Sequence, residues 1–485
     1  MGNKQLAQQL ANLDATAQAE LIRSGQITAT EAVDAAIAAA EEINPKINAI
    51  IHPRYERARD EAKVVDPAAP FAGVPLLVKD LNCAIAGEPH HMGSRALKNA
   101  KFTADTDSFL YRRFKRAGFV ALGRTNTPEF GSTVTTEPLA YGPARNPWNL
   151  DHSTGGSSGG SAASVAARIV AVAHANDGGG SIRVPAGNCG LVGLKPSRSR
   201  VSQGPDVGES WMGGTIDGCV TRSVRDTAAI LDAISGYENG DPHITPFASP
   251  LANEVGKDPG KLRIGFLNHP LLDIGIDHPE CRAAVDHTVQ LLQQLGHEVE
   301  DSFPAAMTEA QFSDLFVGII TASLHADLSA LEFLLGITFD ETNLEPDNLF
   351  FREMGKAVSA ADYINTVRLM HMWSRRMISW WKTPAMDSGD FDILVTPTLS
   401  TPAPEIGWLS GPDGGFHVQQ ILQYTAQFNI TGQPAVSLPL HMTPEGIPVG
   451  VQFVAAPNRE DLLVRLASQI ESAAPWDQRR APNAV

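Results

Sequence analysis

Cysteine is scarce in this chain, which has 485 residues and four cysteines. Cys83, Cys189, Cys219 and Cys281 are too few and too far apart for a disulfide framework or a CxxC metal site. We therefore expect reduced thiols that are mostly buried. Long apolar runs are also missing: none reaches the roughly 18 residues of a membrane-spanning helix, and residues 1–22 lack the apolar stretch of a secretory signal. These absences favour a cytoplasmic protein with no membrane partner.

Basic residues are outnumbered, because 38 lysines and arginines stand against 54 aspartates and glutamates. The formal net charge of −16 opposes nonspecific binding to nucleic acid and to anionic membrane surfaces. The sequence also lacks a Walker A motif, a GxGxxG motif after a strand and an HExxH motif. We therefore expect a small-molecule substrate, and neither a nucleotide cofactor nor a catalytic metal.

The composition is otherwise that of an ordinary globular protein, with 43% apolar and 19% charged residues. Helical and strand patterns alternate along most of the chain. Such repeated units predict an α/β fold with a large, mostly parallel mixed sheet that is covered by helices on both faces.

Apolar periodicity places the expected helices and strands. Helices are expected at 6–43, broken near Ser24 and Gly25 with Thr28 or Thr30 as a cap, and at 55–64, 105–117, 225–234, 279–295, 311–335, 360–381 and 460–472. Strands are expected at 71–81, 119–123, 169–177, 262–267, 392–397, 434–439 and 447–455. The expected helix at 360–381 contains three tryptophans, Trp373, Trp380 and Trp381. We expect their side chains to pack between helices rather than to line a pocket.

Glycine and serine concentrate in the stretch 155–202. Two glycine-rich clusters contain Ser157 and Ser181, and an apolar segment joins them. Glycine lets backbone and substrate approach closely, so such clusters commonly surround a reacting group or an anion. A flexible linker is disfavoured because an apolar helix and strand follow the first cluster. The G-x-S-x-G pattern at 155–159 has no histidine partner motif, and His174 lies in an apolar strand, where we expect a hydrogen-bonded core histidine.

Several segments match one family in the right order. They read GVPLLVKD at 73–80, GGSSGGS at 155–161, GGSIRVPA at 179–186, CGLVGLKP at 189–196, FNITGQPAVSLP at 428–439 and GIPVGVQFVA at 446–455. On these motifs the chain resembles the amidase signature enzymes over most of its length, with 236–390 matching weakly. The resemblance implies a single amidase-signature domain, 1–485. Its expected parts are a helical region at 1–65, a catalytic core at 66–235, a variable region at 236–415 that determines the choice of substrate, and closing core strands and helix at 416–475.

The resemblance also implies roles for individual residues. Ser181 is the acyl-forming nucleophile, Ser157 the bridging serine and Lys79 the base, with a cis peptide bond before Ser157. The backbone N–H groups of the implied oxyanion hole belong to Gly178, Gly179, Gly180 and Ser181. A buried lysine suits the role of base because desolvation favours its neutral form.

Neighbouring residues are expected to support these groups. The expected roles are a structural ion pair for Asp177 and Arg183, turn and helix-start positions for Ser158 and Ser161, and packing for Cys189. The family commonly has Gly-Thr-Asp where this chain has Ala175, Asn176 and Asp177. The nucleophile is unaffected by this difference, but the hydrogen bonding of its loop is left open.

The expected activity is hydrolysis of a carboxylic amide C–N bond through a serine acyl-enzyme. Within the family, segments 14–25, 135–150 and 172–196 are similar to bacterial hydrolases of the 6-aminohexanoate cyclic dimer, which suggests cyclic or linear amides as substrates. Two alternatives are a glutaminase-type subunit of an aminoacyl-tRNA amidotransferase, which needs a partner protein, and a non-catalytic binding protein on the same fold. A homodimer is a further expectation.

Overall fold

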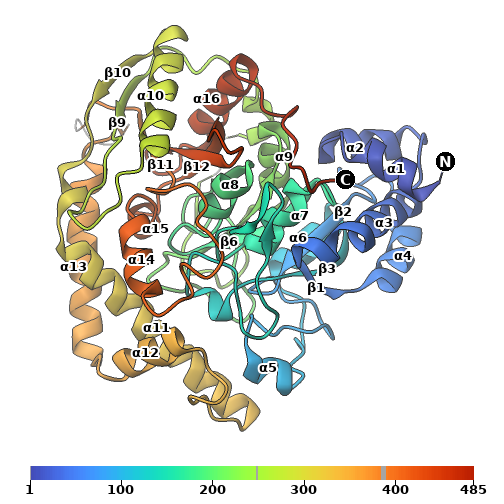
Figure 1. Cartoon of the computed structure of the whole chain (residues 1–485), viewed down its shortest axis with the longest axis horizontal. Helices are drawn as coiled ribbons and strands as arrows, with labels where there is room; N and C mark the ends of the chain where they lie inside the picture. The colour runs from blue at the N-terminus through green and yellow to red at the C-terminus, as the bar shows by residue number, and fades with distance from the viewer. Residues whose placement is uncertain (1, 247–248, 384–388) are drawn as a thin grey trace.

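A mixed sheet of 11 strands forms the centre of the molecule (Figure 1). The computed structural model describes residues 2–246, 249–383 and 389–485. Across the sheet the strand order is β1-β3-β2-β6-β8-β7-β12-β13-β11-β9-β10. In chain order these strands are β1 (Ile50–Pro53), β2 (Pro75–Lys79), β3 (Val120–Thr125), β6 (Val172–Asp177), β7 (Val192–Lys195), β8 (Ile216–Thr221), β9 (Arg263–Phe266), β10 (Glu298–Asp301), β11 (Ile393–Pro397), β12 (Ala435–Met442) and β13 (Pro448–Ala455). A separate pair consists of β4 (Arg145–Asn146) and β5 (Asn149–Ser153).

Parallel pairing is confined to the two ends of this sheet. The pairs β3–β2, β2–β6, β11–β9 and β9–β10 are parallel, whereas β1–β3 and each pair from β6 across to β11 are antiparallel. The reason is connectivity: β7 leads to β8, and β12 to β13, without a helix in between, and strands joined without a crossover helix pair antiparallel. The expected large mixed sheet is confirmed, but its mostly parallel character is corrected for the centre.

Helices cover both faces of the sheet, as expected. Successive side chains of a strand point to opposite faces, and in β2 Leu76 and Val78 join one apolar cluster while Leu77 joins another. The first cluster also includes residues of α2 (Ala15–Arg23), α6 (Phe109–Arg116), α9 (Val224–Ile234), α10 (Pro279–Gln294) and α16 (Glu460–Ala473). The second includes residues of α1 (Asn3–Leu10), α3 (Ala29–Ile47), α4 (Tyr55–Val64), α7 (Gly159–Ala166) and α8 (Arg183–Cys189).

The N-terminal region consists of more helices than expected. The pattern at 6–43 forms α1, α2 and α3, which lie together beside β1 to β3 (Figure 1). Helix α3 begins after Thr28, whose hydroxyl accepts a hydrogen bond from the backbone N–H of Glu31 while the Glu31 carboxylate accepts one from the N–H of Thr28. This reciprocal capping box identifies Thr28, rather than Thr30, as the cap.

The variable region contributes a group of helices at one side of the sheet (Figure 1). Three of them are α11 (Gln311–Leu335), α12 (Pro346–Lys356) and α13 (Ala360–Ile378), and short helices here and elsewhere are α5 (Arg95–Asn99), α14 (Gly414–Ile421) and α15 (Ala426–Ile430). The predicted bounds of α11 are confirmed, whereas α12 was not predicted. By length and composition alone α11 could cross a membrane, since its most apolar window has a mean hydropathy of 1.3. The absence of a membrane span therefore stays a prediction.

The tryptophans of this region pack between elements, as expected. Trp373 and Trp381 are buried, and the ring of Trp373 lies 4.5 Å from that of Phe312 in α11. Trp380 stacks on Phe391 with a centroid distance of 4.1 Å. The indole N–H of Trp381, which lies just after α13, donates to the carbonyl of Val454 in β13 at 3.2 Å. The tryptophans thus connect α11, the end of α13 and the sheet.

Candidate active site

Lys79 is the last residue of β2 and is completely buried. Its Nζ lies 2.7 Å from Ser157 Oγ and 2.5 Å from Asn176 Oδ1. Burial lowers the pKa of Lys79 to about 7, although the negative charges of Asp217 and Asp177 act in the opposite direction. A lysine with this pKa is substantially neutral at physiological pH and can accept a proton.

Strand order explains how Lys79 reaches the glycine-rich stretch. β2 and β6 are parallel neighbours, with Leu76 paired to Val172 and Leu77 to Ala173. The carboxyl ends of parallel strands lie at the same edge of a sheet, where α/β proteins commonly place their sites. Lys79 at the end of β2 is therefore next to the loop that follows β6.

Ser157 belongs to a tightly packed loop that leads into α7. The peptide bond between Gly156 and Ser157 is cis, as the resemblance implied. The carbonyl of Ser157 accepts a hydrogen bond of 2.9 Å from Thr127 Oγ1. A Cβ on Gly156 would lie 2.6 Å from the backbone of Thr135, and one on Gly131 would lie 3.2 Å from Ser157 Oγ. Glycine is required at Gly156 because the backbone of Thr135 approaches so closely, and it suits Gly131 because that residue has a φ of +67°.

Ser181 follows the glycine run at the end of β6 and precedes α8. It is buried, with 8% of its surface exposed. Within the described residues its hydroxyl makes no hydrogen bond. The structure thus brings Lys79 and Ser157 into direct contact and leaves the Ser181 hydroxyl without a protein partner at the same edge of the sheet.

The backbone donors around Ser181 differ from one another. The N–H of Gly180 donates to Asp177 Oδ1 at 2.7 Å, whereas the N–H groups of Gly178, Gly179 and Ser181 bind no acceptor in the part of the chain that the structure describes. An oxyanion hole needs donors that are free to bind the substrate oxygen. The expected set is therefore corrected by one member: Gly180 is engaged by Asp177, and the other donors remain candidates.

Asp177 and Arg183 form the expected ion pair beneath this loop. Both side chains are fully buried, and Arg183 donates through Nε and Nη2 to the two carboxylate oxygens at 2.9 Å each. Arg183 also binds Gln452 Oε1 and Asn429 Oδ1. Burial alone would raise the pKa of Asp177, but the Arg183 guanidinium holds it below its usual range. The pair fixes the loop, because Asp177 also accepts from the N–H of Ile182.

Aromatic side chains lie against the glycine run. A Cβ on Gly178 would lie 2.8 Å from the Trp211 ring, and one on Gly179 would lie 3.4 Å from Phe316 of α11. The two rings meet edge to face with centroids 6.3 Å apart. Through Phe316 the variable region thus reaches the loop that carries Ser181.

Other residues singled out in the sequence have structural roles. His174 is buried in β6 and lies with Nε2 3.0 Å from Asp217 Oδ1, which confirms a core histidine. Cys189 is buried, as are the other three cysteines, and all four are free. Ser161 binds the carbonyl of His174, and Ser158 that of Asn176. Each serine therefore ties the start of α7 to β6.

Asn176 is the residue whose contact with Lys79 could not be expected from the motifs. It lies in an apolar strand, and only its departure from the common Gly-Thr-Asp pattern marked it. Its Oδ1 faces Lys79, and its Nδ2 donates to the carbonyl of Leu81 at 3.1 Å.

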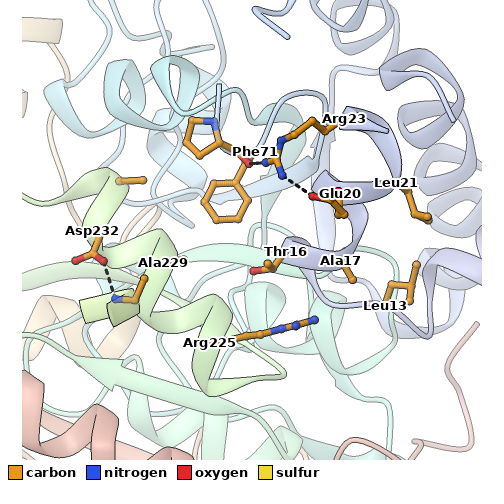
Figure 2. A pocket seen from close by; sticks show the side chains of 13 residues that line it. Leu13, Thr16, Ala17, Glu20, Leu21, Arg23, Phe71, Arg225, Ala229 and Asp232 are labelled. Atoms are coloured by element: carbon orange, nitrogen blue, oxygen red, sulfur yellow. Dashed lines mark hydrogen bonds and ion pairs between the residues drawn. The ribbon is translucent and has the colours of Figure 1, made fainter. Parts of the chain in front are cut away.

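A groove lies away from this site. It has a volume of about 810 Å³ and is bordered by α2 and α9, as Figure 2 shows. Its charged side chains have partners: Arg23 binds Glu20, Arg225 binds Asp14, and Asp232 accepts from two backbone N–H groups. The groove contains none of the expected catalytic residues.

Comparison with known proteins agrees with the motifs. The family model described as Amidase matches residues 31–464. The 6-aminohexanoate-cyclic-dimer hydrolase of Paenarthrobacter ureafaciens is 42% identical over 481 residues, covering 96% of each chain. A solved structure of 6-aminohexanoate cyclic dimer hydrolase complexed with substrate superposes with a TM-score of 0.93 at 41% identity, covering 98% of this chain and 100% of that one. A solved glutamyl-tRNA(Gln) amidotransferase chain from Thermotoga maritima gives a TM-score of 0.78 at 25% identity, with 96% of each chain covered. The chain belongs to the amidase family.

Proposed function

We propose that this amidase cleaves its amide substrate through an acyl-enzyme on Ser181, with Ser157 as proton relay and Lys79 as base. The observation that carries the proposal is the contact of 2.7 Å between Lys79 Nζ and Ser157 Oγ in a fully buried site. A serine hydroxyl is a weak nucleophile at neutral pH and needs a base. A lysine whose pKa is about 7 can be that base without a histidine.

The first half of the reaction forms the acyl-enzyme. Ser181 Oγ attacks the amide carbon while its proton passes to Ser157, whose own proton passes to Lys79. A hydroxyl can donate and accept at once, which suits Ser157 to the middle position. The negative oxygen of the tetrahedral intermediate is stabilised by free N–H groups among Gly178, Gly179 and Ser181. When the C–N bond breaks, the relay returns the proton to the departing amine.

The second half releases the acid. Water attacks the ester carbon of acyl-Ser181, and Lys79 accepts the water proton through Ser157. Collapse of the intermediate breaks the bond between carbon and Ser181 Oγ, and the relay restores the hydroxyl proton. The products are a carboxylic acid and an amine, and the enzyme returns to its starting state.

The proposed substrates are amides of the 6-aminohexanoate type, either cyclic or linear. The support is the similarity over the whole chain to the hydrolase from P. ureafaciens, at 42% identity. A cyclic dimer of this kind is a ring of methylene chains and amide groups without charged termini. The apolar rings of Trp211 and Phe316 beside the glycine run suit such methylene chains better than they suit an amino acid with two charged groups.

The glutaminase alternative rests on the likeness to the amidotransferase chain, which is lower in identity, at 25%. A panel of the 6-aminohexanoate cyclic dimer, its linear dimer, a simple aryl amide and glutamine distinguishes the two functions when products are identified by mass spectrometry. We expect amine products from the first three and no ammonia from glutamine. Ammonia release from glutamine in preference to the other amides would contradict the proposed substrate class.

Variants of the three catalytic candidates test the mechanism. We expect Ser181→Ala to remove turnover and the acyl-enzyme adduct seen by mass spectrometry after acid quenching, and Lys79→Ala to reduce kcat by several orders of magnitude. In the unmodified enzyme kcat/KM rises with pH through about 7, because the base acts only when its amine is neutral. A normal rate in either variant would rule the mechanism out.

A further inference from the structure

The environment of the Lys79 amine is asymmetric. Nζ has two partners within hydrogen-bonding distance, the hydroxyl of Ser157 at 2.7 Å and the carboxamide oxygen of Asn176 at 2.5 Å. A neutral primary amine has a lone pair as well as its N–H groups, and only the lone pair can accept a proton. The rate of the relay therefore depends on which partner faces the lone pair.

The carboxamide of Asn176 is oriented by its other hydrogen bonds. Nδ2 donates to the carbonyl of Leu81 at 3.1 Å, so the acceptor Oδ1 must face Lys79. A flipped amide would place NH2 against the amine and would lose the bond to Leu81. An amide oxygen has no proton to give, hence Lys79 must donate an N–H to Asn176.

The backbone of Asn176 is held in place as well. It lies in β6, opposite Asp217 of β8. Ser158 Oγ lies 3.2 Å from the Asn176 carbonyl and 3.3 Å from its N–H, and Ser158 follows directly after the relay serine. The distance from the carboxamide to Ser157 is thereby fixed through two separate connections.

We propose that Asn176 is a positioning residue that takes one N–H of Lys79 and so aims the lysine lone pair at the hydroxyl of Ser157. This inference rests on the proposed function, since it concerns the base of that mechanism. It also gives a reason for an amide, instead of a carboxylate, at this place. A carboxylate would accept the same N–H but would stabilise the protonated lysine, which cannot act as a base.

The charges around Lys79 make the neutral partner important. The charges that act on Lys79 include Asp177 of β6 and Asp217 of β8, His174 of β6 is close enough to be affected by the lysine charge, and Arg124 of β3 donates to the Lys79 carbonyl. Asp177 and Asp217 already raise the pKa of Lys79 against the effect of burial. A further carboxylate at 2.5 Å would add to theirs, whereas the carboxamide adds no charge.

The test compares Asn176→Ala, Asn176→Asp and Asn176→Thr in the full-length enzyme. For Asn176→Ala we expect kcat to fall about 10- to 100-fold, within the range of general-base effects, with KM nearly unchanged. For Asn176→Asp we expect a similar or larger fall and a shift of the acid limb of the kcat profile to higher pH, because the carboxylate favours protonated Lys79. Asn176→Thr keeps a hydroxyl acceptor and should recover part of the rate lost in Asn176→Ala.

Asn44→Ala is the matched control. This asparagine binds backbone groups at the end of α3 and lies outside the proposed site. Its replacement should lower the thermal midpoint while kcat and its pH profile stay unchanged. The thermal midpoints of the Asn176 variants show whether each is folded. If Asn176→Ala does not fold, Asn176→Thr takes its place in the comparison of kcat.

The outcomes separate the two proposals. Loss of activity in Lys79→Ala together with normal kcat and an unmoved pH profile in Asn176→Ala and Asn176→Asp would overturn the role of Asn176 and leave the mechanism standing. Normal activity in Lys79→Ala would overturn the mechanism itself. A fall in kcat with a shifted acid limb in Asn176→Asp supports both.

Discussion

Two helices of this protein show how differently its parts are built. All eight residues of α7, which follows Ser157 and Ser158, are buried, whereas α11 buries six of its 25. In α7 a Cβ on Gly160 would lie 2.4 Å from the backbone of Asn126, so the packing leaves no space for a side chain. Near the end of α11, Phe333 is 93% exposed. The proposed catalytic residues lie in a dense core. The helices that reach this core from the variable region have an outer face that is exposed to solvent.

The ion pairs of the core and of the variable region also differ in how deeply they are buried. Arg183 binds Asp177 with two hydrogen bonds in the core, and Arg376 of α13 binds Glu309 with two hydrogen bonds at the surface. The first pair is fully buried, while the side chains of the second are 49% and 34% exposed. Removing one partner should therefore cost very different amounts of stability, because only in the buried pair is the remaining charge left without water.

Breaking the buried pair gives the largest expected effect. Arg183→Met leaves Asp177 as an unpaired buried carboxylate, and we expect the free energy of unfolding to fall by about 3–5 kcal/mol. Since the pair holds the pKa of Asp177 below its usual range, its contribution is present at neutral pH and is lost as the pH falls through and below the ordinary aspartate pKa of about 4. Chemical denaturation at several pH values measures both effects.

Arg376→Met is the control for that experiment. It removes an arginine with the same two-point contact at the surface, and the expected loss is below about 1 kcal/mol. Equal losses of unfolding free energy in the two variants would contradict the expected difference between a buried and an exposed ion pair.

A medium effect is expected where the variable region reaches the site. Phe316→Ala removes an aromatic ring that lies against Gly179, so we expect KM for a substrate with methylene chains to rise about 10-fold or more. The kcat for a small aliphatic amide should change little, because Lys79 and Ser157 are untouched. Steady-state kinetics on both substrates measures the difference. An equal change of kcat for both amides would show that Phe316 supports the catalytic loop instead of selecting the substrate.

The smallest effect is expected on the outer face of the same helix. Phe333→Ala makes the same substitution at a side chain that is 93% exposed, and stability should change by no more than about 0.5 kcal/mol. Kinetic constants should be unaffected. Sedimentation analysis should be run alongside, because a larger loss of stability, or a fall in molecular mass, would show that this face is covered by a second copy of the chain.

The motifs pointed to the contact between Lys79 and Ser157, whereas the catalytic roles of Lys79, Ser157 and Ser181 stay predictions. Ser157 and Ser181 stand in glycine-rich clusters, and Lys79 is a charge at the end of an apolar strand, which is an unusual place for one. Lys79 meets Asn176 once β2 and β6 are neighbours. The hydrogen bond from Ser158 to the Asn176 carbonyl holds Ser157, 78 residues from Lys79 in the chain, at the same place. This contact could be predicted because close backbone approach requires glycine, and because a charged residue at the end of an apolar strand is unusual.

Other features of the site and the sheet could not be predicted from the sequence. The role of Asn176 depends on a hydrogen bond between strands, and an asparagine inside an apolar strand has many possible partners. The engagement of Gly180 by Asp177 depends on loop geometry that a run of glycines does not specify. The short strands β7 and β8 were not predicted, and without them the antiparallel centre of the sheet could not be foreseen.

The pairing of β2 with β6 has a consequence for how the protein acquires activity during folding. Lys79 and Asn176 come together only when Leu76 aligns with Val172 and Leu77 with Ala173. A slip of one residue in this register would turn Lys79 to the opposite face of the sheet. Parallel strands pair late in folding because a long loop must first close. The rate at which amide hydrolysis returns during refolding therefore reports when β2 and β6 pair in the correct register. The enzyme's own substrate serves as the probe.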